Sequence, residues 1–139
     1  KEVDIDSLKV DYIFVTRGHQ DHVLDVEAVA KNNPEALLVS NFEVVTWFGN
    51  KGIEGHGMNH GGKYTFDFGT AKYVTAIHSS MLPDGSNGGN PGGFVLYNDS
   101  KCIYIAGDRF DQGYGTDSKN LSKIGYCGSA HWGQFYHGL

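Results

Sequence analysis

This 139-residue sequence has only two cysteines, no long apolar stretch and no basic run. Cys102 lies in an apolar run and Cys127 in a glycine-rich tail, so we expect no disulfide framework and a core thiol at Cys102. Nothing approaches the roughly 18 consecutive apolar residues of a membrane span, and residues 1–4 lack the apolar core of a signal peptide. These absences argue against a membrane protein and predict a cytoplasmic one.

The net charge of the chain limits the kinds of partner that it is expected to bind. A net charge of −5 without clustered Lys or Arg argues against nucleic acid, because phosphate-backbone binding draws most of its affinity from such clusters. A nuclease is therefore disfavoured, and a small-molecule substrate is expected. The length fits a single domain over residues 1–139, and 40% apolar residues, with two Trp, eight Phe and eight Tyr, can supply its core.

Apolar periodicity divides the chain into short strands and helices. β-branched and aromatic runs predict strands, amphipathic stripes predict helices, and the glycine-rich stretch 84–93 predicts a loop. The expected strands cover residues 10–16, 36–40, 63–68, 72–77, 94–97 and 102–106, and the expected helices cover residues 23–32 and 43–50. This mixture predicts an α/β or α+β layered domain.

The most informative segment follows the first predicted strand. Within four residues it holds two imidazoles and a carboxylate, from His19, Asp21 and His22. A short turn can aim such groups at one point, and His and Asp ligands suit a divalent metal, with zinc first and manganese or iron as alternatives. Arg17 cannot ligate a metal and would repel one. The alternative interpretation is that these residues cap a helix and face solvent.

Residues 16–22 resemble the His-x-His-x-Asp-His signature of the metallo-β-lactamase superfamily. His19 matches the second His of that signature, and Asp21 and His22 match its last two residues. Arg17 stands where the first His should be.

Later segments resemble further motifs of the same family, in the family's order. Residues 76–80 are similar to the segment with the next metal ligand, here His78, and residues 104–108 to the strand that ends in a bridging carboxylate, here Asp108. The segments 41–43, 57–62 and 82–93 narrow the resemblance to a branch described as metal-dependent hydrolases.

The resemblance implies a metallo-β-lactamase-like αββα sandwich. Family members are usually much longer and have strands before the metal motif, so the sequence is expected to hold a partial sandwich. Sheet edges left open by missing strands invite pairing with another chain, which makes a homo-oligomer a candidate state.

The resemblance also implies a set of metal ligands. His131, within residues 131–135, resembles the last metal His of the family. The candidate ligands are therefore His19, Asp21, His22, His78, Asp108 and His131. In a two-metal site the first metal would use His19, His78 and the position that Arg17 fills.

The implied activity is metal-dependent hydrolysis, in which a metal-activated water attacks an ester, lactone, amide or phosphoester. Asp21 and Asp108 are the predicted catalytic carboxylates, and Arg17 and His60 the predicted substrate-binding residues. The competing hypothesis, which Arg17 favours, is an impaired or inactive remnant that serves at most as a binding module. Ordinary roles also stay open, such as a turn residue at Asp108, a satisfied polar group at His78 and an exposed loop residue at His60.

Overall fold

The computed structural model describes residues 4–108 and 124–126. After a short 3-10 helix, η1 (Ile5–Ser7), a three-stranded parallel sheet has the order β1 (Tyr12–Phe14), β2 (Leu37–Asn41) and β3 (Gly55–Met58). Between these strands the chain forms α1 (Gln20–Val23), α2 (Val26–Asn32) and α3 (Phe42–Gly49).

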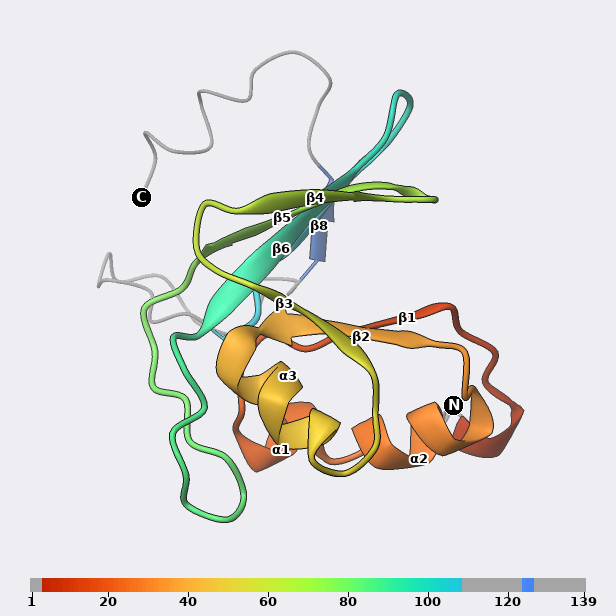
Figure 1. Ribbon diagram of the computed structural model, residues 1–139. Helices are drawn as coiled ribbons and strands as arrows, with labels where there is room; N and C mark the ends of the chain where they lie inside the picture. The colour runs from red at the N-terminus through yellow and green to blue at the C-terminus, as the bar shows by residue number, and fades with distance from the viewer. Residues whose placement is uncertain (1–3, 109–123, 127–139) are drawn as a thin grey trace.

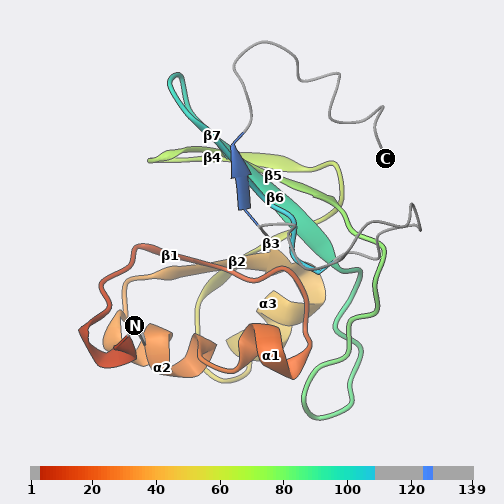
Figure 2. The same cartoon turned by 180° about the vertical axis from the view of Figure 1, so that it is seen from behind.

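The second sheet has five antiparallel strands in chain order. They are β4 (Lys63–Phe66), β5 (Gly69–Thr75), β6 (Gly92–Tyr97), β7 (Cys102–Ile105) and β8 (Ile124–Tyr126). The helices form one outer layer, the parallel sheet lies in the middle and the five-stranded sheet covers its other face (Figure 1). The view from behind shows the same three layers (Figure 2). This helix–sheet–sheet order confirms the predicted layered fold, as part of an αββα sandwich.

Strand β2 lies between two hydrophobic clusters because successive side chains on a strand point to opposite faces. Leu38 packs with Val44 and Phe48 under the helices, whereas the neighbouring Val39 packs with Phe94 against the second sheet. None of these side chains is more than 1% exposed. Burial of each large apolar side chain stabilises the fold by about 1.5–3 kcal/mol.

The expected helix over residues 23–32 is two helices, α1 and α2, with a turn at residues 24–25. Val23, Val26 and Ala30 nevertheless all face the core, as the periodicity predicted. The other predicted strands and the second predicted helix overlap the observed elements.

Strand β3 was not predicted, because its sequence is rich in glycine and reads as a loop. A Cβ at Gly55 would lie 2.8 Å from Val45 Cγ1 and 3.0 Å from the Leu38 carbonyl oxygen. The missing side chain therefore lets α3 pack closely over this edge strand, a tertiary reason that local sequence patterns do not reveal.

Cys102 is partly buried and disulfide-bonded, which corrects the expectation of a core thiol without a disulfide. In the described part of the chain, no helix has the length and apolar character required to cross a membrane. The tail of the sequence from residue 127 and the segment 109–123 lie outside the described residues.

Candidate metal centre

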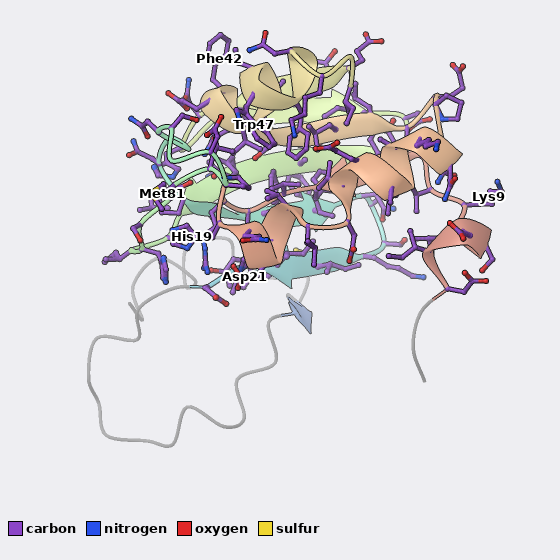
Figure 3. The ribbon with its side chains drawn as sticks, turned by 90° about the horizontal axis from the view of Figure 1, so that it is seen from below. Lys9, His19, Asp21, Phe42, Trp47 and Met81 are labelled. Carbon is purple, nitrogen blue, oxygen red and sulfur yellow. The ribbon has the colours of Figure 1, made fainter. Side chains whose placement is uncertain are left out.

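The predicted site residues gather where strand ends of both sheets meet. Strands β1, β2 and β3 are parallel and share a carboxyl edge, and β5 and β7 run in the same direction as each other on either side of β6. The Gly92 N–H donates to the Thr16 carbonyl oxygen at 2.9 Å and ties the sheets together at this edge. His19, Asp21 and Met81 lie at one end of the molecule and Lys9 at the opposite end (Figure 3).

Three candidate ligands converge there. Asp21, His22 and Asp108 each offer one ligand atom, and these atoms all lie within 4.8 Å of one another. His22 Nε2 lies 3.5 Å from Asp21 Oδ2 and 3.4 Å from Asp108 Oδ2. Carboxylate oxygen and imidazole nitrogen suit zinc, manganese and iron, so these residues fit one divalent metal.

Arg17 enters the same cluster from the buried side. Its side chain is 4% exposed, and Nη2 lies 2.9 Å from Asp108 Oδ2 and 3.6 Å from Asp21 Oδ2. Its Nε donates to His19 Nδ1 at 3.1 Å. Among the described residues, Nη1 of Arg17 is buried and has no hydrogen-bond partner. The cluster thus already contains one fixed positive charge.

Thr16 orients the ring of His22, with Oγ1 lying 3.0 Å from Nδ1. When Nδ1 carries the proton, the lone pair of Nε2 faces the two carboxylates. Burial lowers the pKa of His22, and the charge of Arg17 lowers it further. The imidazole is therefore neutral at pH 7, which is the form that binds metals. Sequence reasoning missed Thr16, although it directly precedes the motif.

His19 and His78 form a second pair, with ring centroids 5.3 Å apart. His19 is the N-cap residue of α1, but its side chain makes no capping hydrogen bond. Its Nε2 lies 3.4 Å from Ser79 Oγ. His78 is exposed, and its Nδ1 accepts from the Ser79 N–H at 2.9 Å. The structure brings these two histidines together beside Arg17, outside the three-residue cluster.

Gly107 places Asp108 in the cluster. Its φ of +65° is in the left-handed region that glycine favours, and a Cβ there would lie 2.9 Å from the Cβ of Thr16. The chain leaving β7 can therefore turn tightly over Thr16 and deliver the carboxylate to Arg17 and His22.

A polar pocket of about 460 Å³ includes Tyr73, whose hydroxyl hydrogen-bonds to the backbone of Thr16, in its lining. Its lining includes His60, Tyr73, Asn41, Glu43 and Asn90. Burial raises the pKa of Tyr73, and its hydroxyl donates to the carbonyl oxygens of Thr16 and Asn90 at 3.1 and 3.0 Å. The ring of His60 stacks on Tyr73 at 5.2 Å between centroids. The predicted substrate-binding residue His60 thus lines a pocket near the candidate ligands.

Asn41 is a second residue that sequence reasoning missed. It is 2% exposed, and its Oδ1 accepts from the Val44 N–H at 2.9 Å as the N-cap of α3. Its Nδ2 donates to the carbonyl oxygens of Gly88 and Asn90 at 2.7 and 3.1 Å. An asparagine just before an apolar helix is a known start signal, and that signal was available in the sequence.

His131 lies outside the described residues. Its assignment as the last metal ligand stays a prediction.

The layered fold and its converging ligands define the class of protein as a metallo-β-lactamase-fold domain with a candidate metal centre. Residues 3–116 match the family described as "Beta-lactamase superfamily domain", and the chain therefore belongs to that superfamily. This confirms the resemblance found in the motifs.

The chain is similar to curated proteins named metal-dependent hydrolases. A UPF0173 metal-dependent hydrolase of Flavobacterium johnsoniae is 58% identical over 106 residues, which are 76% of this chain and 47% of that protein. Another, from Christiangramia forsetii, is 59% identical over 107 residues, which are 77% of this chain and 47% of that protein. The chain spans about half the length of these relatives.

Solved structures agree on the fold. Igni18, a metallo hydrolase from Ignicoccus hospitalis, is 30% identical with a TM-score of 0.64, over 74% of this chain and 44% of that protein. The metallo-beta-lactamase fold protein YhfI from Bacillus subtilis has a TM-score of 0.54 at 13% identity, over 71% of this chain and 41% of that protein, and it supports the fold alone.

Proposed function

We propose that this chain carries the metal-binding part of a hydrolase that uses one divalent metal, with zinc as the first candidate. The observation that supports this most strongly is the convergence of Asp21, His22 and Asp108, whose ligand atoms lie within 4.8 Å of one another. The printed names of the curated relatives point to the same class of activity. The cytoplasmic location and a homo-oligomeric state remain predictions.

Asp21, His22 and Asp108 would hold the divalent metal, which would supply Lewis acidity that lowers the pKa of water and polarises the substrate. The carboxylate oxygens of Asp21 and Asp108 would orient the attacking water, and one of the two carboxylates would accept its proton. Thr16 holds the ring of His22 through Nδ1, so that Nε2 faces the two carboxylates. The positive charge of Arg17 lies on the buried side of the cluster, where it would stabilise negative charge that develops on the substrate.

The polar pocket supports a small substrate with several hydrogen-bonding groups. The imidazole of His60, the amide of Asn59 and the carboxylate of Glu43 all contribute to its lining. Esters, lactones, amides and phosphoesters all fit the reaction class. Removal of His60 should raise KM more than it lowers kcat, because His60 lies in the pocket wall and outside the ligand cluster.

Metal content by plasma mass spectrometry, measured on the full chain, tests the proposal. The parent chain should retain about one metal, and Asp21→Ala and His22→Ala should lose most of it. His56→Ala is the matched control, since the His56 ring packs on Tyr64 in β4, with centroids 4.2 Å apart. Unchanged metal content in Asp21→Ala and His22→Ala would contradict the proposed centre.

The second candidate function is an inactive remnant that acts as a binding module, and the Arg17–Asp108 ion pair favours it. Such a remnant should show no metal-dependent gain in thermal stability. A centre that binds metal in the folded state must gain stability by mass action, about 2.7 kcal/mol at a metal concentration of 100 times Kd. Thermal melts with and without zinc therefore separate the two functions.

A further inference from the structure

Arg17 is the most unusual member of the cluster. A cation that is 4% exposed lies beside a cation-binding site, and its Nη2 contacts the same two oxygens, Asp108 Oδ2 and Asp21 Oδ2, that approach His22. A guanidinium keeps its charge and offers no lone pair to a metal. Arg17 therefore competes with a metal ion for the carboxylate oxygens of Asp21 and Asp108, and it provides no ligand atom itself.

We propose that the guanidinium of Arg17 is a built-in cation of this centre, which takes the place of a second metal ion and limits the chain to a single metal. This inference deepens the proposed function and rests on its metal centre. The position of Arg17 is thus filled by a charge that organises the surrounding ligands.

The contacts of the guanidinium support this role. Through Nη2 it approaches both carboxylates, and through Nε it donates to His19 Nδ1 at 3.1 Å. A metal ion beside His19 would face the same neighbours, a histidine and two carboxylate oxygens. His78 lies next to His19, with ring centroids 5.3 Å apart, and adds a second imidazole on this side.

The burial of Arg17 also separates this role from that of a mobile surface arginine. The guanidinium is held by the contacts of Nη2 and Nε, whereas Nη1 is, among the described residues, a buried nitrogen without a hydrogen-bond partner. A charge fixed in this way repels any cation that approaches Asp21 and Asp108, whose side chains are 67% and 31% exposed and so accessible to a metal ion from solvent.

Zinc titration of the metal-free full chain tests the inference, with affinity and stoichiometry as readouts. Arg17→Met removes the charge and should tighten zinc binding by roughly tenfold or more. Arg17→Lys keeps a charge and should bind zinc more weakly than Arg17→Met. Arg17→His adds a ligand beside His19 and His78 and should raise the stoichiometry from one zinc toward two.

Lys51→Met is the matched control for the loss of one positive charge. Lys51 follows the end of α3 and pairs with Glu27 of α2, so this variant should bind zinc as the parent does. If Arg17→Met and Lys51→Met bind zinc with equal affinity, and Arg17→His binds no more zinc than the parent, the inference is wrong. If Arg17→Met does not fold, the comparison of Arg17→Lys with Arg17→His decides in the same way.

The outcomes also separate this inference from the proposed function. A parent chain that binds one zinc but hydrolyses no substrate would contradict the proposed activity and leave the role of Arg17 intact. Zinc binding by Arg17→Met, where the parent binds none, would contradict the single-metal centre of the parent and favour the inactive remnant. Absence of zinc from the parent and from all three Arg17 variants would overturn both.

Discussion

The two sheets contribute to the molecule in different ways. The parallel sheet is covered on both faces, by helices and by the second sheet, and the segment after β1 carries three of the six predicted ligands. The five-stranded sheet supplies an aromatic face to the core, and within the described residues it brings Asp108 into the centre after β7 and His78 beside His19 after β5. The comparison teaches that the centre belongs to neither sheet alone, because Arg17 after β1 pairs with Asp108 after β7.

The largest expected effect on stability comes from truncating one large side chain in either hydrophobic cluster. Phe48→Ala opens the cluster under the helices and Phe94→Ala opens the cluster between the sheets, and each should lower the free energy of unfolding by about 3–5 kcal/mol. Because β2 contributes Leu38 to one cluster and Val39 to the other, urea unfolding should show one transition in both variants.

A variant at an exposed phenylalanine provides the control for this pair. Phe42 is 62% exposed, and Phe42→Ala should change the free energy of unfolding by about 0.5 kcal/mol or less. Two separate transitions in either core variant would show that the sheets unfold independently, and would contradict the expectation that β2 couples the two clusters.

An intermediate effect is expected where a polar side chain joins the layers. Asn41→Ala removes the cap of α3 and leaves the carbonyl oxygens of Gly88 and Asn90 without their donor. The free energy of unfolding should fall by about 1–2 kcal/mol, measured by urea unfolding. Thr46→Ala, on the exposed face of the same helix, is the control, and an equal loss there would argue against a special role of Asn41.

The smallest effect is expected at Asp84, on the loop that reaches α3. Hydrogen bonds from Ser86, and then from Trp47, lower the pKa of Asp84 from 3.8 to about 2. A carboxyl group whose pKa is lower in the folded state stabilises the fold above its unfolded pKa, and this stability is lost as the pH falls toward 2. Asp84→Asn should therefore be less stable than the parent at pH 5, and the difference should shrink between pH 4 and about 2. A difference independent of pH would contradict this account.

The sequence predicted the fold where periodicity carried the information. Alternating and β-branched runs located β1, β2, β5 and β7, and the helix expected to end at residue 32 does end there, as α2. β3 was not predicted because its glycines allow the close approach of α3, and local sequence patterns do not reveal such a tertiary contact. The turn between α1 and α2 was not predicted because the buried positions keep helical spacing across it.

For the candidate site, the sequence identified residues that the structure groups, but it did not indicate the contacts between them. The motif located Asp21, His22 and Asp108, and the structure brings these three together. Neither the burial of Arg17 nor its pairing with Asp108 followed from the sequence, because both depend on the packing of the two sheets. Whether the grouped residues bind metal stays a prediction that the zinc titrations test.

The contact between His22 and Asp108 joins residues 86 positions apart in the chain. Contacts of such long range close a large loop, and they form after local structure during folding. The centre can therefore assemble only once both sheets have docked, and a chain with one sheet formed lacks either Asp108 or its partners. Metal capture during refolding would then report the final docking step, at a time when the helices and hairpins have already formed.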